Sequence, residues 1–288
     1  MASLNLLLLV LVTVPTVSCD FSPSFRSWIN TTYGQSTLDA LARTDIGSVG
    51  SFGGGTHDGL SQTNKRPILI VHGITNTAGT FNPQRNYFLS NGWSEETVHG
   101  TTYGDGGVTP VTQVKMTCAF VKQLRKMLEV VNAFTQQKVD VVGYSLGSPI
   151  IRKAILGGTC VDTNENLGGS YTHMVETYVS VAGANRGSTS CTIPWPFVAA
   201  CNSNNGLYCG SQFLSNINSQ ASRYEGTASF SIYGPNDDKV GNTNVCSANP
   251  NSRFPFTNDE MSNAVGNHDA ILANYVDVTK QLFETQAF

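Results

Sequence analysis

The stretch Val139-Asp140-Val141-Val142-Gly143-Tyr144-Ser145-Leu146-Gly147 decides the fold of this 288-residue chain. Its valine-rich start predicts a buried strand over 139–142, and the following pattern predicts a helix over 148–156 that ends at Gly157-Gly158. Glycines two positions before and after Ser145 let strand and helix approach each other around a sharp turn. The pentapeptide G-x-S-x-G also occurs by chance, as a glycine-rich turn with an incidental serine. Between a strand and a helix it indicates a nucleophile elbow that exposes Ser145 at the carboxyl edge of a sheet.

Strands and helices alternate on both sides of this stretch. The run Ile68-Leu69-Ile70-Val71 is apolar throughout, as expected for a strand buried on both faces of a parallel sheet. Apolar residues at spacings of three or four predict a long amphipathic helix over 112–131. The alternation predicts an α/β fold with a mostly parallel sheet and helices on both faces. The other expected elements are strands at 175–181 and 230–233, helices at 82–91 and 270–282, and a loop at 185–210 that is rich in Cys, Pro and Asn.

The composition narrows the classes of function. Charged residues make up 13% of the chain, the formal net charge is -3, and lysine and arginine form no run longer than Lys65-Arg66. This argues against a nucleic-acid-binding surface, which needs a basic face. No G-x-G-x-x-G follows the first expected strand, so a dinucleotide-dependent oxidoreductase is also disfavoured.

The N-terminus is typical of a targeting segment. An apolar run over 6–14 is interrupted by a proline and followed by Thr16-Val17-Ser18-Cys19. The run is shorter than the roughly 20 residues of a membrane span, so we predict a cleaved signal peptide over 1–19 and a secreted, extracellular protein. A buried strand or a membrane anchor is the alternative. Residues 20–64, rich in Ser, Thr and Gly, are predicted to form an irregular N-terminal extension that wraps a catalytic domain over 65–288.

Cysteine usage agrees with an extracellular route. The chain has seven cysteines. Cleavage after Cys19 leaves an even number suited to disulfides, whereas cleavage after Ser18 leaves one spare cysteine. No pair has C-x-x-C spacing, which argues against zinc binding or thioredoxin chemistry. Cys201 and Cys209 flank a turn-rich segment and are a candidate pair, although six cysteines allow many connectivities. The sequon Asn30-Thr31-Thr32 is a candidate glycosylation site.

A serine hydroxyl needs a base, and the expected chain order is serine, acid, histidine. Of the five histidines only His173 and His268 follow Ser145. His173 lies just before the strand expected at 175–181, so it enters the sheet instead of leaving it. His268 lies in Gly266-Asn267-His268-Asp269, a predicted loop ahead of the last helix, which is the expected place of the base. A capping or surface histidine is the alternative.

The acid must lie between these two residues. Asp237 and Asp238 follow the strand expected at 230–233, so they lie at a strand's carboxyl end. The acid would hold the imidazole in the right tautomer and stabilise its positive form. The aspartate that is not used would be solvated or paired with Lys239. The other candidates are in a strand or in polar loops: Glu176, Glu225, Asp259 and Glu260.

Acyl transfer builds negative charge on a carbonyl oxygen, which backbone N–H groups stabilise, each by about 10²–10³ in rate. One donor is expected to be Leu146, the residue after the nucleophile. The second is expected from the loop after the first strand, where His72-Gly73-Ile74 places Ile74. His72 itself is expected to position this loop and not to act as the base.

Five segments, taken together and in this order, carry a family resemblance: PILIVHGI (67–74), NGW (91–93), KVDVVGYSLG (138–147), VAGANRG (181–187) and SIYGPNDDKV (231–240). They resemble the class 2 lipase family of the α/β-hydrolase superfamily, which includes small bacterial lipases of bacilli and secreted nematode lipases. The resemblance covers about residues 66–285.

The resemblance implies an α/β-hydrolase fold with a triad of Ser145, Asp237 and His268. In the family motif the acid follows Ile-Tyr by four positions and precedes Val by three, which places it at Asp237 and not at Asp238. Carried over in the same way, Ile74 and Leu146 supply the oxyanion hole. The implied substrates are carboxylic esters, including acylglycerols, and no metal or organic cofactor is implied.

This chain departs from the small bacterial members by its N-terminal extension and by a Cys-rich insertion at 188–210. The insertion contains Ile193-Pro194-Trp195-Pro196-Phe197-Val198, an apolar stretch within a loop. Either this stretch packs against the domain and is pinned by disulfides, or it is a flap that lines the acyl site or contacts a lipid–water interface.

The sequence thus predicts a secreted serine hydrolase, a triacylglycerol lipase or carboxylesterase that cleaves lipid esters through an acyl-enzyme. A phospholipase or an acyltransferase with the same triad is the nearest alternative. A catalytically silent hydrolase-fold protein that binds lipid or a partner is a further one, but such proteins usually lack a triad member. No nucleic-acid partner and no stable transmembrane anchor are expected.

Overall fold

The computed structural model describes residues 20–195 and 197–288, so the predicted signal peptide over 1–19 lies outside the described residues. In the described ranges, seven strands form one sheet in the order β1-β3-β2-β4-β5-β6-β7. β1 pairs antiparallel with β3, and the other pairs are parallel, which confirms the predicted mostly parallel sheet. The strands are β1 (Ser51–Phe52), β2 (Ile68–Val71), β3 (Val98–Thr101), β4 (Val139–Tyr144), β5 (Val175–Val181), β6 (Ala228–Ile232) and β7 (Asp259–Met261).

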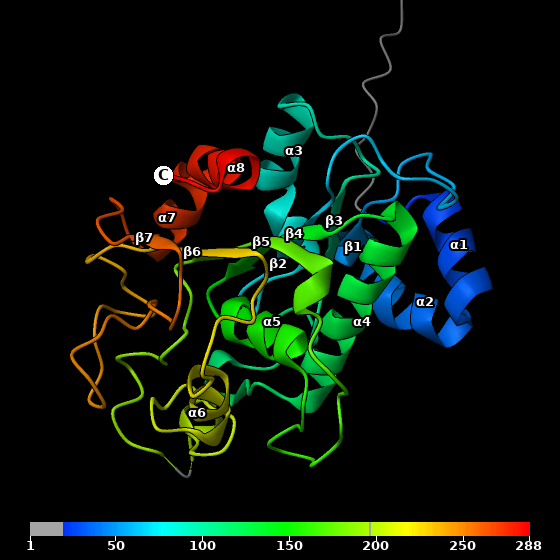
Figure 1. The fold of residues 1–288 in the computed structure, drawn as a ribbon. Coiled ribbons are helices and arrows are strands. Elements are labelled where there is room, and N and C mark those ends of the chain that lie inside the picture. Colours follow the sequence, from blue (N-terminus) through cyan, green and yellow to red (C-terminus); the bar gives the residue numbers. More distant parts are fainter. Residues whose placement is uncertain (1–19, 196) are drawn as a thin grey trace, which may run out of the picture.

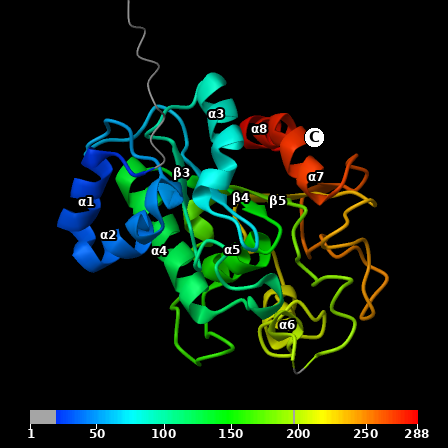
Figure 2. The same cartoon turned by 180° about the vertical axis from the view of Figure 1, so that it is seen from behind.

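Helices cover both faces of the sheet, as predicted (Figure 1). Their bounds are α1 (Pro23–Tyr33), α2 (Gln35–Ala42), α3 (Asn82–Ser90), α4 (Cys118–Thr135), α5 (Gly147–Leu156), α6 (Gln212–Asn218), α7 (His268–Asn274) and α8 (Val276–Thr285). α3, α7 and α8 lie on one face, and α2, α4, α5 and α6 lie on the other, with α1 beside α2 (Figures 1 and 2). Short 3-10 helices connect these elements: η1 (Thr44–Val49), η2 (Ala78–Phe81), η3 (Val111–Gln113), η4 (Thr172–Met174) and η5 (Ala199–Cys201).

Each face of the sheet has its own apolar core. One core joins α1, α2, α4, α5 and α6 to the sheet, and Phe134 and Ile151 are fully buried in it. The other joins α3, α7 and α8 to the opposite face around Phe88 and Leu282. The strands β2, β4 and β6 between them are buried at every residue. This two-sided burial holds the carboxyl end of β4 in place.

The prediction of an irregular segment over 20–64 was wrong for residues 23–52, whereas residues 53–64 contain no helix or strand. Residues 23–52 contain α1, α2, η1 and β1, which adds an antiparallel edge strand to the sheet. The local signals were present: Ser22 caps α1, its Oγ accepts the N–H of Phe25, and Pro23 begins the helix. Phe25 then packs on Phe134 of α4, with ring centroids 4.4 Å apart. The segment is therefore part of the core on the α4 face.

The long helix expected over 112–131 begins later, at Cys118. Thr117 caps it, because its Oγ1 accepts the N–H of Phe120. The carboxylate of Asp162 accepts the N–H of Cys118 at 3.0 Å. These two caps, and not the apolar stripe, set the start of α4.

Other bounds also differ from the prediction. The closing helix expected over 270–282 is two helices, α7 and α8, separated at Tyr275. The predicted strand over 175–181 and helix over 82–91 agree with β5 and α3 to within one residue. β1, β3, β7 and α6 are additional elements that the sequence did not predict, since they are short and lack a continuous apolar run.

Three disulfides join six of the cysteines: Cys118–Cys160, Cys191–Cys201 and Cys209–Cys246. The candidate pair Cys201–Cys209 was wrong, because Cys201 is bonded to Cys191 and Cys209 is bonded to Cys246. Cys118, Cys160 and Asp162 lie within 4.8 Å of one another. The two sulfurs are bonded to each other and Asp162 caps α4, so this cluster is explained without a metal.

Candidate active site

Ser145 occupies a strained turn between β4 and α5. Its φ of 53° lies in the left-handed region, which costs a residue other than glycine roughly 1–2 kcal/mol. Such strain is typical of residues held for function. The neighbouring glycines are required by close approach: a Cβ at Gly147 would lie 2.2 Å from the carbonyl oxygen of His72, and one at Gly143 would lie 2.8 Å from Cα of Ser148. The turn thus has the geometry that the G-x-S-x-G motif predicts.

Hydrogen bonds hold the backbone of Ser145 on both sides. Its N–H donates to the carbonyl oxygen of Val181, and its own carbonyl accepts the N–H of Ala184, both at 3.1 Å. The side chain lines a cavity of about 590 Å³, which His268 also lines. The predicted nucleophile Ser145 and the predicted base His268 therefore line the same cavity, at the carboxyl end of the sheet.

Asp237 and His268 form a buried pair. Nδ1 of His268 donates to Oδ2 of Asp237 at 2.8 Å, and each side chain is only 2% exposed. The other oxygen, Oδ1, accepts the N–H groups of Lys239 and Val240 at 3.0 and 2.8 Å. Burial raises the pKa of Asp237, but the hydrogen bond and charge of His268, with the two N–H groups, outweigh it and hold the pKa below its usual value.

Asp238 lies next to this pair but has another contact. Its Oδ1 accepts the backbone N–H of His268 at 3.0 Å and does not reach the ring. His268 is the first residue of α7, and the side chain of Asn267 caps that helix. Two aspartates and a helix cap therefore fix the position of His268.

Because Asp237 holds Nδ1, Nε2 is the nitrogen of His268 left for Ser145. Within the described ranges no hydrogen bond joins Ser145 Oγ to the His268 ring. Catalytic hydrogen bonds are often long until a substrate is bound, so this geometry is compatible with a base.

The two expected oxyanion donors also lie at the cavity. Ile74 and Leu146 both line it. The loop that carries Ile74 lies against the nucleophile, because a Cβ at Gly73 would be 2.9 Å from Cβ of Ser145. In the described part of the chain, the backbone N–H groups of Ile74 and Leu146 donate to no other protein group.

His72 is a buried support of that loop. Its Nε2 accepts the N–H of Tyr103 at 3.0 Å, so Nδ1 carries the proton and donates to the carbonyl of Gly73 at 2.7 Å. The ring stacks on Tyr103 with centroids 4.1 Å apart. Burial lowers the pKa of His72 to about 4, so the ring is neutral at neutral pH. These contacts show a structural role for His72.

The cavity has a polar side and an apolar side. Lys239 and Asp269 form an ion pair at 2.7 Å on the polar side, and the hydroxyl of Tyr144 donates to Asp269 at 2.8 Å. The hydrogen bond that Lys239 Nζ donates to the carboxylate of Asp269 lowers the pKa of Asp269. The apolar side is formed by Val111, Val198, Ala200, Leu207, Val240 and the Cys191–Cys201 disulfide.

Sequence reasoning missed several of these residues. Val111 lies in η3, one residue before the helix expected over 112–131, and Tyr144 was considered only as part of the serine motif. Asp269 and Lys239 are 30 positions apart and meet only in the folded chain. No pattern along the sequence could have paired them.

The chain is similar to known lipases. A family model described as lipase (class 2) matches residues 65–281. The mature form of Bacillus licheniformis lipase BlEst2 is similar, with 16% identity, a TM-score of 0.56 and coverage of 81% of this chain and 97% of that one. Aspergillus fumigatus lipase B has 14% identity and a TM-score of 0.54, and the match covers 81% of this chain and 54% of that one. At these identities the structural likeness shows the fold alone, which is that of the α/β-hydrolases.

No helix in the described residues is both long and apolar enough to cross a membrane.

Proposed function

The chain belongs to the class 2 lipase family, and from this premise we propose that it cleaves carboxylic esters of lipids through an acyl-enzyme on Ser145. Membership in the family supports a carboxylic ester hydrolase that acts on lipid or ester substrates. One observation carries the proposed mechanism. The buried Asp237–His268 pair lines the same cavity as a serine in a strained turn.

In the first half-reaction Ser145 Oγ attacks the carbonyl carbon of the ester while its proton passes to Nε2 of His268. The carbonyl oxygen becomes negative, and the N–H groups of Ile74 and Leu146 stabilise it. Asp237 stabilises the imidazolium through Nδ1. The C–O bond to the alcohol then breaks, His268 returns the proton to the leaving oxygen, and the acyl group stays on Ser145.

In the second half-reaction water attacks the acyl-enzyme and gives its proton to His268. The same two N–H groups stabilise the second oxyanion. When this intermediate collapses, the carboxylic acid leaves and the proton returns to Ser145 Oγ. The products are one alcohol and one carboxylic acid, and the cycle uses no cofactor.

The apolar side of the cavity supports a lipid substrate. Val198, Ala200 and Leu207 from the insertion at 188–210 face the cavity that contains Ser145. An acyl chain buried against this surface gains roughly 0.8 kcal/mol for each CH₂ removed from water. The polar side, with Lys239 and Asp269, would then face the alcohol.

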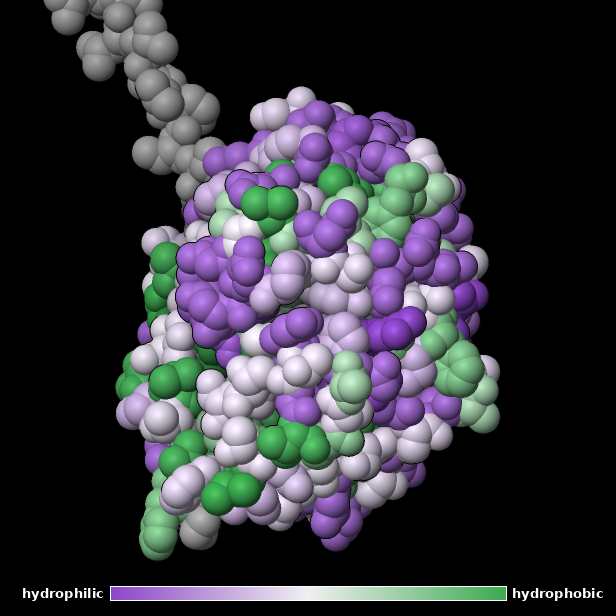
Figure 3. All heavy atoms as spheres, turned by 90° about the vertical axis from the view of Figure 1, so that its left-hand side faces the viewer, coloured by the Kyte–Doolittle hydropathy of each residue, from purple (hydrophilic) through white to green (hydrophobic). Residues whose placement is uncertain are grey.

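The insertion also supports action at a lipid–water interface. Ile193, Trp195 and Phe197 are 50%, 47% and 86% exposed, so this stretch is not packed into the domain. Figure 3 shows hydrophobic side chains gathered toward the lower left edge of one face of the molecule. From Gly187 to Ser222 the chain has no Asp, Glu, Lys, Arg or His. Contact with an uncharged lipid surface would therefore desolvate no charge on this segment.

Secretion is part of the proposal. Three disulfides are typical of proteins that fold in an oxidising compartment. Asn30 of the sequon lies on the exposed surface of α1, where a glycan could be attached. Expression in a secreting eukaryotic host should release the protein into the medium, with a mass decrease after peptide N-glycosidase that is absent in Asn30→Gln.

A hydrolysis profile tests the proposed reaction. The wild-type enzyme and Ser145→Ala are assayed on p-nitrophenyl esters of increasing chain length, on emulsified triacylglycerol and on phosphatidylcholine, and the products are identified. We expect release of fatty acid from triacylglycerol and its loss in Ser145→Ala. Release from phosphatidylcholine alone would indicate a phospholipase, ester formed with an added alcohol in place of free acid would indicate an acyltransferase, and near-normal turnover by Ser145→Ala would refute the mechanism.

A further inference from the structure

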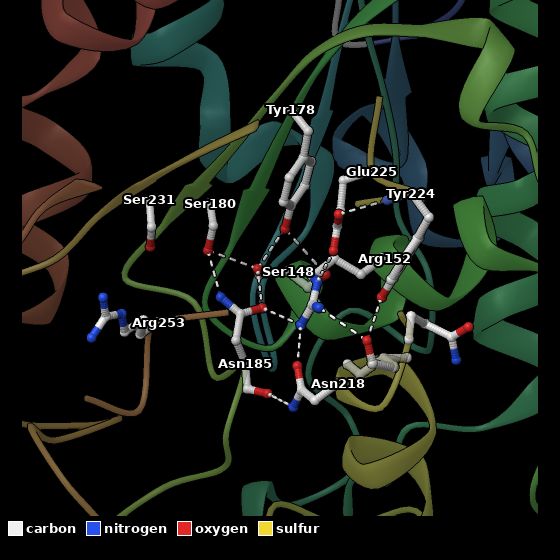
Figure 4. A network of polar contacts seen from close by, with 12 residues as sticks. Ser148, Arg152, Tyr178, Ser180, Asn185, Asn218, Tyr224, Glu225, Ser231 and Arg253 are labelled. Atoms are coloured by element: carbon white, nitrogen blue, oxygen red, sulfur yellow. Dashed lines mark hydrogen bonds and ion pairs between the residues drawn. The ribbon is translucent and has the colours of Figure 1, made fainter. Parts of the chain in front are cut away.

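A buried polar network begins at Ser148, three residues after Ser145, and is shown in Figure 4. It joins the first turn of α5, the end of β5 and the segment 181–185. Ser148, Arg152, Ser180 and Asn185 are at its centre, and each of them is fully buried or nearly so. The proposed reaction gives none of these side chains a direct role.

Asn185 closes a ring of hydrogen bonds in this network. Its Nδ2 donates to Oγ of Ser180, and its Oδ1 accepts from Oγ of Ser148, both at 2.8 Å. Ser148 has only one O–H to donate, so the 2.8 Å contact between the two serines is donated by Ser180. All three bonds run in the same direction around the ring, an arrangement in which each bond polarises the next.

The remaining hydrogen-bonding capacity of Asn185 is also used. Nδ2 donates a second bond to the carbonyl of Ser252 at 2.8 Å, and Oδ1 lies 3.4 Å from Nη1 of Arg152. The guanidinium of Arg152 is held in turn by Glu225, with Nε 2.9 Å from Oε1. This position requires a side chain that donates two hydrogen bonds and has an oxygen that accepts two more. Asparagine is the only residue of this size that does so.

The ring lies against the segment that holds Ser145. Val181 and Ala184 each make a backbone hydrogen bond to Ser145, and Asn185 follows Ala184 immediately. A Cβ at Gly183 would lie 2.2 Å from Oγ of Ser180 and 2.5 Å from Oγ of Ser148, so the segment packs directly on the ring. Ser148, on the other side of Ser145, is three residues along the chain. The ring therefore ties together the two segments that flank Ser145.

We propose that Asn185 is a positioning residue, which fixes the direction of Ser145 Oγ relative to His268 by closing this ring. The inference rests on the proposed function of Ser145. His268 is held by separate contacts, from Asp237 and Asp238, so loss of the ring moves the serine and leaves the base in place. A displacement of about 1 Å between reacting groups lowers rates by up to about 10²-fold.

The test measures each enzyme per active site. A fluorophosphonate titrates the reactive serine, and kcat and KM for p-nitrophenyl butyrate are then determined per titrated site, together with the pH profile. Asn185→Ala should lower kcat by about 10- to 100-fold with KM within about twofold and with the acid limb of the pH profile unchanged. Asn132→Ala is the matched control, because this α4 asparagine also donates to a backbone carbonyl, that of Gln137 at 2.7 Å, away from the cavity.

Two outcomes overturn the proposal: an unchanged kcat per titrated site in Asn185→Ala, or an equal loss in Asn132→Ala. If Asn185→Ala does not fold, Ser148→Ala, which removes one bond of the ring, is judged by the same criterion. Ser145→Ala separates this proposal from the proposed function. If that variant is inactive and Asn185→Ala is normal, only the positioning role fails. If Ser145→Ala retains turnover, the proposed function fails first.

Discussion

The floor and the wall of the cavity are built in opposite ways. The floor, formed by the β4–α5 turn, the segment 181–185 and the network below them, contains a fully buried ion pair, Arg152–Glu225. The wall, formed by residues 188–210, has no charged side chain and exposes large apolar groups. Catalysis requires reacting atoms that are held in fixed directions, and a polar network in which every group is hydrogen-bonded holds them so. Lipid binding requires apolar area, which needs no fixed direction. Changes in the floor should therefore alter kcat on every ester, and changes in the wall should alter only the use of lipid aggregates.

The largest effect is expected in Asp237→Asn, at the pair that lines the cavity together with the floor. Loss of the carboxylate that holds Nδ1 of His268 should lower kcat on the order of 10⁴-fold. The loss should be equal on soluble p-nitrophenyl butyrate and on emulsified tributyrin. Asp238→Asn is the matched control, and its loss should be much smaller because Asp238 binds only the backbone of His268. If only Asp238→Asn lost activity, the acid would have to be reassigned.

A second effect concerns His72, which supports the floor through the loop at Gly73. Burial lowers its pKa to about 4, against about 6.5 in an unfolded chain. The unfolded chain takes up a proton between these pH values and the folded chain does not. The contribution of His72 to the free energy of unfolding is thus fully present above pH 6.5. It is lost as the pH falls toward 4, and the loss is on the order of 3 kcal/mol. The deficit in Tm of His72→Asn should be large at pH 7.5 and smaller at pH 4.5.

The control for this effect comes from the wall. Trp195→Ser should show the same change in Tm between pH 7.5 and pH 4.5 as the wild type, since its segment has no Asp, Glu, Lys, Arg or His. An equal deficit of His72→Asn at both pH values would contradict the assignment of a neutral, buried His72.

The wall should respond to loss of its disulfide. Cys191 and Cys201 close a loop with a sequence separation of 10, and removing such a link costs about 2–3 kcal/mol of stability. The double variant Cys191→Ser/Cys201→Ser should lower activity on emulsified tributyrin more than on p-nitrophenyl butyrate, measured well below its Tm. Equal losses on both substrates would mean that the loop supports the catalytic groups, as the floor does.

The smallest effect is expected for a single exposed side chain of the wall. Trp195→Ser should lower activity on emulsified triacylglycerol several-fold, because about half of this indole is exposed and available to the lipid surface. Turnover of a soluble short ester should not change. Leu60→Ser is the control, an exposed apolar residue on the N-terminal extension that does not line the cavity. A comparable loss in both variants on the emulsion would remove the special role of the insertion.

The contrast between floor and wall also explains what the sequence could predict. The β4–α5 turn was predictable because strand, glycines and helix follow one another, and each has a local cause. His268 followed from chain order. The ring at Asn185 was not predictable, because Ser148, Ser180 and Asn185 come together only through the pairing of β4 with β5. The disulfide pairs and the caps of α4 likewise depend on contacts between distant segments.

The central claim is that Ser145 is the nucleophile, and covalent labelling tests it most directly. The enzyme is incubated with a fluorophosphonate, digested, and the modified peptide is identified by mass spectrometry. The account predicts one adduct, on Ser145, which forms slowly in Asp237→Asn and is absent in Ser145→Ala. An adduct on another residue, or hydrolytic activity that survives complete labelling of Ser145, would contradict it.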